Sequence, residues 1–149
     1  MALMFPRLAR NFIKNGYFPT DEPTLERALT ALAPSSGPTC ILDPCAGEGV
    51  AIAEAAHALG REQVKAFAVE YDAERATHAR GLVDRCLHGD LMDSLISRQS
   101  FGLLWLNRPG AAVPFVVEVD RDGGVRAVGP AAEGYPPSDA QIAFARARF

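Results

Sequence analysis

Short apolar runs alternate with helical patterns along the first two thirds of the chain. The apolar runs predict four strands, the third of them weak, at residues 39–42, 66–70, 85–90 and 101–106. The segments between them predict three helices, at residues 50–59, 72–82 and 91–97. This alternation is typical of an α/β fold with a mostly parallel sheet and helices on both faces.

The two ends of the chain follow other patterns. Thr20 stands as a hydroxyl cap before two acids and a proline, which predicts a helix that stops in the Pro/Ser/Gly-rich segment 34–38. Residues 115–128 alternate around an Asp-Gly-Gly turn and predict a hairpin. We therefore divide the chain into a ligand-binding domain at 1–110 and an atypical C-terminal part at 111–149, a hairpin followed by a short helix.

One connection carries most of the chemical information. The link between the first predicted strand and the next helix reads DPCAGEG, residues 43–49. Gly47 and Gly49 let the backbone approach a ligand where side chains would block it. The helix that begins at Val50 offers unpaired N–H groups and a positive dipole end, which suit a carboxylate or a phosphate. The pattern indicates a nucleotide-type loop.

Polar residues follow four predicted strands. Asp43, Glu70, Asp90 and Asn107 each stand at the carboxyl end of one strand. Such ends meet at one edge of a parallel sheet, where ligands bind in folds of this class. We therefore expect the four side chains to share one site.

Composition narrows the alternatives. The 149 residues carry a formal charge of −3 and no basic run, which weighs against tight autonomous DNA binding without excluding a DNA substrate. The three cysteines fit no zinc spacing, so no metal is expected. Neither a signal peptide nor a membrane span is expected, and free thiols predict the reducing cytoplasm.

Glycine loops of this kind serve both dinucleotide-dependent dehydrogenases and methyltransferases that use S-adenosyl-L-methionine. The dinucleotide fingerprint needs a small residue where this chain has Ile52. Asp43 and Glu48 would repel a pyrophosphate but suit an ammonium and a sulfonium. Glu70 is spaced to meet ribose hydroxyls in either cofactor. The loop favours S-adenosylmethionine, and a nicotinamide cofactor remains the alternative.

Five motifs in order resemble those of amino-group DNA methyltransferases. They are NGYFPT at 15–20, DPCAGEG at 43–49, VEYD at 69–72, GDL at 89–91 and LNRP at 106–109. More narrowly, the chain resembles an uncharacterised methyltransferase-like family of bacterial mobile elements. The resemblance implies a Rossmann-like methyltransferase fold, S-adenosyl-L-methionine as cofactor and an adenine amino group in DNA as substrate.

The resemblance also implies a cofactor site of nine residues. These are Tyr17, Thr20, Asp43, Pro44, Gly47, Gly49, Glu70, Tyr71 and Asp90. The first two would close over the methionine end, and Asp43 would hold its ammonium directly or through water. Glu70 would accept hydrogen bonds from both ribose hydroxyls. Tyr71 would lie against the adenine ring, and Asp90 would accept from its exocyclic amine.

The resemblance places the catalytic residues at Asn107 and Pro109. In the family pattern Asn-Pro-Pro-Tyr, the Asn side chain and a backbone carbonyl accept hydrogen bonds from the target amine, and the aromatic ring stacks on the flipped base. Here Arg108 replaces the first proline and Gly110 the aromatic residue. Loss of a stacking ring costs about 1–3 kcal/mol per base. These departures favour a cofactor-binding but inactive protein, or a half-enzyme completed by a partner, over an active enzyme.

The segment after Gly110 is too short for the remaining strands of a complete methyltransferase sheet. We therefore expect a truncated or frame-shifted relative with an incomplete C-terminal part. Without a neighbouring strand, residues 103–106 would present a hydrophobic edge, which predicts self-association. The hairpin at 115–128 is the alternative cover for that edge.

Overall fold

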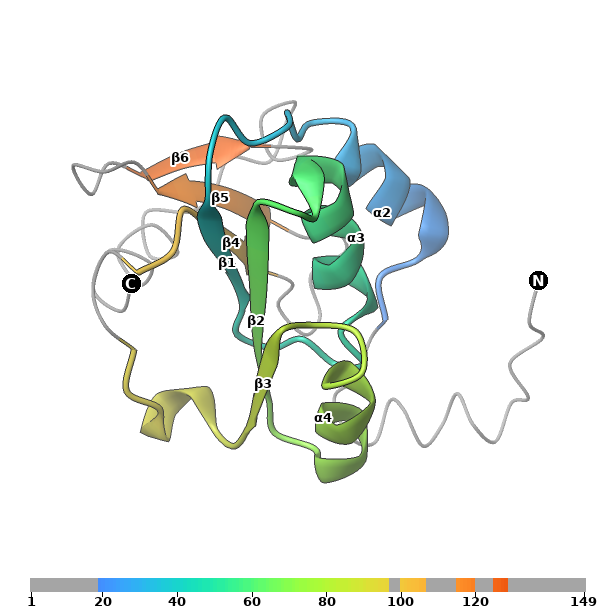
Figure 1. Cartoon of the computed structure of the whole chain (residues 1–149). Helices are drawn as coiled ribbons and strands as arrows, with labels where there is room; N and C mark the ends of the chain where they lie inside the picture. Colours follow the sequence, from blue (N-terminus) through green and yellow to red (C-terminus); the bar gives the residue numbers. More distant parts are fainter. Residues whose placement is uncertain (1–18, 97–99, 107–114, 120–124, 129–149) are drawn as a thin grey trace.

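The computed structural model describes residues 19–96, 100–106, 115–119 and 125–128. The strands form one six-stranded sheet in the order β3-β2-β1-β4-β5-β6. They are β1 (Thr39–Asp43), β2 (Val64–Glu70), β3 (Arg85–His88), β4 (Leu103–Leu106), β5 (Phe115–Val119) and β6 (Val125–Val128). The helices are α2 (Glu22–Leu29), α3 (Val50–Gly60), α4 (Ala73–Ala79) and the 3-10 helix η1 (Leu91–Asp93) (Figure 1).

The first four strands pair with one another in parallel. β1 lies between β2 and β4. The chain passes from β1 through α3 to β2 and through α4 to β3, and it then returns to place β4 on the other side of β1. Asp43 and Glu70 end β1 and β2 at the same edge of the sheet. The predicted α/β architecture with a mostly parallel, Rossmann-like sheet is confirmed; within the described residues the three α-helices cover one face and η1 lies on the other.

The predicted hairpin is confirmed and continues the sheet. β5 pairs antiparallel with β4, from Leu103 opposite Glu118 to Leu106 opposite Phe115. β6 then pairs antiparallel with β5. The β4 edge that was expected to be exposed is therefore covered by β5, and the end strands of the described sheet are β3 and β6. Self-association remains a prediction, but the β4 edge is not open for it.

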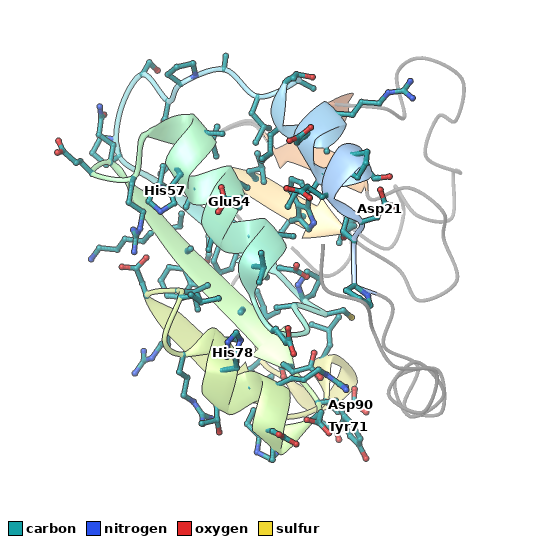
Figure 2. All side chains as sticks on the ribbon, turned by 90° about the vertical axis from the view of Figure 1, so that its right-hand side faces the viewer. Asp21, Glu54, His57, Tyr71, His78 and Asp90 are labelled. Atoms are coloured by element: carbon teal, nitrogen blue, oxygen red, sulfur yellow. The ribbon has the colours of Figure 1, made fainter. Side chains whose placement is uncertain are left out.

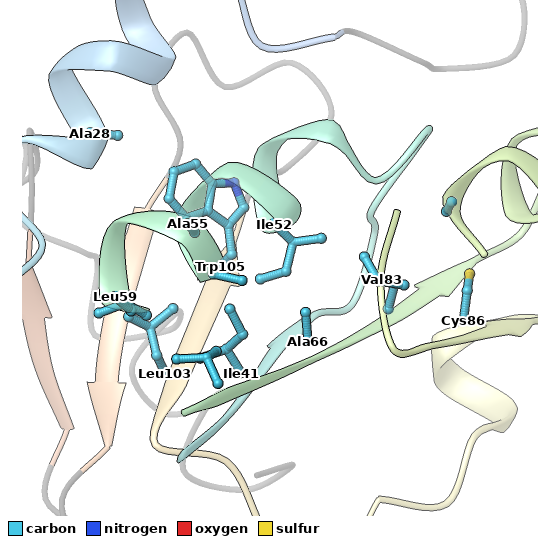
Figure 3. Close-up of a cluster of buried hydrophobic side chains, with 14 of the residues drawn as sticks. Ala28, Ile41, Ile52, Ala55, Leu59, Ala66, Val83, Cys86, Leu103 and Trp105 are labelled. Atoms are coloured by element: carbon cyan, nitrogen blue, oxygen red, sulfur yellow. The ribbon is translucent and has the colours of Figure 1, made fainter. Parts of the chain in front are cut away.

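The main core lies between the sheet and the three α-helices of the described part, which pack on the same face (Figure 1). Trp105 of β4 is fully buried there and shares the cluster with Ala28 of α2 and Ala55 of α3 (Figure 3). The opposite face carries a smaller cluster around Leu42 and Leu104, against which Leu91 of η1 packs. Burial on both faces explains why β1 and β4 read as continuous apolar runs.

Several element boundaries differ from the sequence prediction, most clearly those of three helices. The N-cap of α2 is Asp21 rather than Thr20, because the Asp21 carboxylate accepts the Thr24 N–H at 2.9 Å. α4 ends at Ala79, shortly before Gly81. The helix expected at 91–97 is, in its described part, only the single turn of η1.

Candidate functional site

The glycine loop, residues 44–49, joins β1 to α3 in a conformation that needs glycine. Gly47 has φ 58° and Gly49 has φ 83°, the left-handed region that side chains disfavour. Gly49 also lies against α4, since a Cβ placed on it would be 2.9 Å from the Ala79 Cβ. Gly49 therefore has a packing role beside any role in ligand approach.

Glu70 connects this loop to the end of β2. Its side chain is buried, and Oε2 accepts the Gly47 N–H at 2.8 Å, across 23 residues of sequence. Oε1 accepts the Asp72 N–H at 2.9 Å. The structure thus brings together two of the residues predicted to bind the cofactor, and their contact fixes the loop against the strand end.

Arg75 completes this cluster, although the sequence analysis did not single it out. Its Nε and Nη2 donate to Glu70 Oε1 at 3.1 and 2.9 Å. The two side chains are only 13% and 7% exposed, so the ion pair is largely removed from water. The sequence did contain an indication of this contact, because Arg75 stands in the first turn of the helix that follows Glu70.

Asp43 is the second buried acid of the site. It is 2% exposed, and its Oδ1 accepts the Cys45 N–H at 2.9 Å. Burial raises the pKa of Asp43 to about 7, the Cys45 N–H opposes that rise, and the negative charge of Glu70 adds to it. A carboxyl group with this pKa is present in both its neutral and its ionised form near neutral pH, and a ligand cation placed beside it would favour the ionised form.

Tyr71 and Asp90 lie at the same end of the sheet (Figure 2). Tyr71 follows β2 and is 75% exposed, whereas Asp90 follows β3 and is also exposed. The His88 Nε2 is 3.1 Å from the Tyr71 carbonyl oxygen and donates to it when that nitrogen carries the proton. The predicted roles of Tyr71 and Asp90 in adenine recognition stay predictions.

The other predicted cofactor residues divide between described and undescribed parts. Pro44 is buried in the loop, directly after Asp43. Thr20 precedes Asp21 at the start of α2, which lies apart from Tyr71 and Asp90 (Figure 2). Tyr17 and the catalytic candidates Asn107 and Pro109 lie outside the described residues, as do Arg108 and Gly110.

The family is identified by sequence comparison. A model of an uncharacterised methyltransferase family (DUF6094) matches residues 2–127. The chain belongs to this family. The predicted methyltransferase ancestry is therefore confirmed, whereas adenine in DNA as substrate and an origin in mobile elements stay predictions.

Solved structures give a further comparison for this methyltransferase-family chain. A TehB-like SAM-dependent methyltransferase from Corynebacterium glutamicum is 24% identical, with a TM-score of 0.43. The match covers 66% of this chain and 50% of that protein, so this chain spans about half of its length. A search of the curated proteins found no match.

Three other observations concern the described residues of this family member. Within the described residues no three His, Cys, Asp or Glu side chains are grouped so that they could hold a metal ion. No helix among those residues is long and apolar enough to cross a membrane. A cavity of about 260 Å³ lies at the amino ends of β1 and β4, lined by Leu32, Thr39 and Gly102 among others, and so at the opposite end from Asp43 and Glu70.

Proposed function

We propose that the chain binds S-adenosyl-L-methionine at the carboxyl ends of β1 and β2 and uses it as the methyl donor for transfer to an amino group. The observation that carries this proposal is the hydrogen bond between Gly47 and Glu70, which joins a glycine loop to a buried acid at the next strand end. Membership of a methyltransferase family supports the same reaction class. When bound, the cofactor supplies an electrophilic methyl group on a sulfonium.

The charges of the site fit this cofactor. Glu70 pairs with the Arg75 guanidinium, and Asp43 is a second buried acid whose pKa the negative charge of Glu70 helps to raise. The surplus of negative charge favours a ligand with an ammonium and a sulfonium over one with a pyrophosphate. Asp43 would hold the ammonium and Glu70 the ribose, while Tyr71 and Asp90 would contact the adenine.

A nicotinamide cofactor fits less well. Ile52, where the dinucleotide fingerprint needs a small residue, is fully buried in the first turn of α3 and packs in the main core. Its side chain fills the space that a small residue would leave for close packing of helix on strand. The loop therefore lacks the geometry that the dinucleotide fingerprint provides.

Calorimetric titration with S-adenosylhomocysteine tests the proposal. We expect saturable binding by the wild-type protein and a loss of about 1.5–3 kcal/mol in Glu70→Ala, the scale for a hydrogen bond to a charged group. Glu54→Ala, which removes an exposed acid of α3, is the matched control and should bind as the wild type does. Absence of binding by folded wild-type protein would contradict the proposal.

The substrate we propose is the amino group of adenine in DNA, in line with the motif order that ends at Asn107 and Pro109. Transfer of a labelled methyl group to DNA, followed by nucleoside analysis, should show label on the adenine amine. Arg108 and Gly110 support a second candidate, a protein that binds the cofactor without methylating. Binding of S-adenosylhomocysteine together with no labelled product on DNA would favour this second candidate.

A further inference from the structure

The two carboxylate oxygens of Glu70 are unequally occupied. Oε1 accepts three hydrogen bonds, from the Asp72 N–H at 2.9 Å and from Arg75 Nε and Nη2 at 3.1 and 2.9 Å. Oε2 accepts, among the described residues, only the Gly47 N–H at 2.8 Å. A carboxylate oxygen offers about two lone-pair directions, so Oε1 has no acceptor capacity left and Oε2 has one direction free.

Arg75 is held in place by the start of its helix. Asp72 caps α4, and its Oδ1 accepts the Arg75 N–H at 3.0 Å. The same Asp72 donates its own N–H to Glu70 Oε1, so the backbone of this turn and the Arg75 side chain converge on one oxygen. Charge-assisted bonds between largely buried partners are costly to release, because each partner would be left without its counter-charge.

We propose that Arg75 is a specificity-determining residue, which confines Glu70 to a single ribose hydroxyl of the cofactor through Oε2. This inference rests on the proposed function. Without Arg75, a carboxylate at this position has an oxygen for each of the two hydroxyls, which is the arrangement that the resemblance implies. With Arg75 in place, one hydroxyl donates a hydrogen bond to Glu70, and the other hydroxyl contacts solvent or other groups.

Deoxy analogues of S-adenosylhomocysteine show whether Glu70 of the wild-type protein binds one ribose hydroxyl or both. We expect one of the 2′-deoxy and 3′-deoxy compounds to bind about 10- to 100-fold more weakly than the parent compound, as for a lost hydrogen bond to a charged acceptor. The other should bind within about threefold of the parent compound. A comparable loss for both analogues, or no loss for either, would overturn the inference.

The variant Arg75→Met tests the role of the guanidinium itself. It frees lone pairs on Oε1, so the analogue that the wild type tolerated should now bind about tenfold more weakly than the parent compound. A merely structural role for Arg75 would weaken all three ligands alike and leave the ratios unchanged. Arg80→Met, at the exposed C-cap of the same helix, is the control and should keep the wild-type ratios.

The two proposals fail in different ways. Absence of S-adenosylhomocysteine binding by wild-type protein refutes the proposed function and the inference with it. Binding of the parent compound with equal sensitivity to both deoxy analogues refutes the inference alone. If Arg75→Met does not fold, as shown by the absence of a cooperative melting transition, the binding of the two deoxy analogues to wild-type protein still tests the inference.

Discussion

Replacement of Gly49 with alanine is expected to lower the free energy of unfolding by about 2–5 kcal/mol. An L-residue in the left-handed region costs about 1–2 kcal/mol, and Gly49 has φ 83°. The added Cβ would also lie 2.9 Å from the Ala79 Cβ and 3.1 Å from the Ala79 Cα, so the backbone of α4 has to move. Overpacking of this kind costs about 1–3 kcal/mol more. Urea unfolding measures the total.

Two other glycines separate the terms of that prediction. Gly60 has φ 100°, but no atom lies within 4 Å of the position that a Cβ would take, so Gly60→Ala reports the backbone cost alone. Gly37 has an equally open surrounding without a positive φ, and Gly37→Ala should change the free energy of unfolding by no more than about 0.5 kcal/mol. If Gly49→Ala costs no more than Gly60→Ala, then α3 and α4 are not in close contact at the loop.

Asp43→Asn is expected to stabilise the protein at pH 8 and to leave its stability unchanged near pH 4. The pKa of Asp43 is about 7 in the folded protein against an ordinary value of 3.8. Between these values the folded protein keeps a proton that the unfolded chain has lost, so stability falls as the pH rises. Above pH 7 the full cost, about 4 kcal/mol, is present. Asparagine removes it while its side-chain oxygen can still accept the Cys45 N–H.

Denaturant unfolding of both proteins between pH 4 and pH 8 measures this difference. Asp93→Asn, which changes an exposed acid of η1, is the control and should follow the wild-type curve. The same Asp43→Asn protein should bind S-adenosylhomocysteine more weakly at pH 8, because the proposed partner of the ligand ammonium is then neutral. Equal stability of wild type and Asp43→Asn at pH 8 would show that Asp43 is ionised in the folded protein at little cost.

The sequence predicts the parallel part of this fold well because local and long-range requirements agree there. The apolar runs that become β1 and β4 are buried on both faces, and the acids that end β1 and β2 stand at the same edge of the sheet. The Gly47–Glu70 contact follows from the same topology, since a loop after one strand meets the end of its parallel neighbour. The hairpin was also predictable, because its turn chemistry is local.

The rest depends on choices that the sequence leaves open. Thr20 and Asp21 are both good N-caps, and only the geometry of the first turn selects Asp21. Glu70 reads as a free acceptor in the sequence, whereas in the structure Arg75 occupies one of its oxygens. Whether two side chains form a buried ion pair depends on the directions in which they point, and the spacing of the residues in the sequence does not determine those directions. The catalytic segment around Asn107 remains a prediction from its motif.

The sheet order has a consequence for the order in which the molecule folds. β4 meets β5, and β5 meets β6, through contacts between residues close in sequence, as with Leu106 opposite Phe115. β1 meets β4 at Ile41 opposite Leu103, a pairing that closes a loop of about 60 residues and so carries a larger entropic cost. Local ladders form fastest, and distant parallel pairings form late. We therefore expect the β1–β4 seam, which brings the glycine loop beside the end of β4, to be among the last parts of the native structure to assemble.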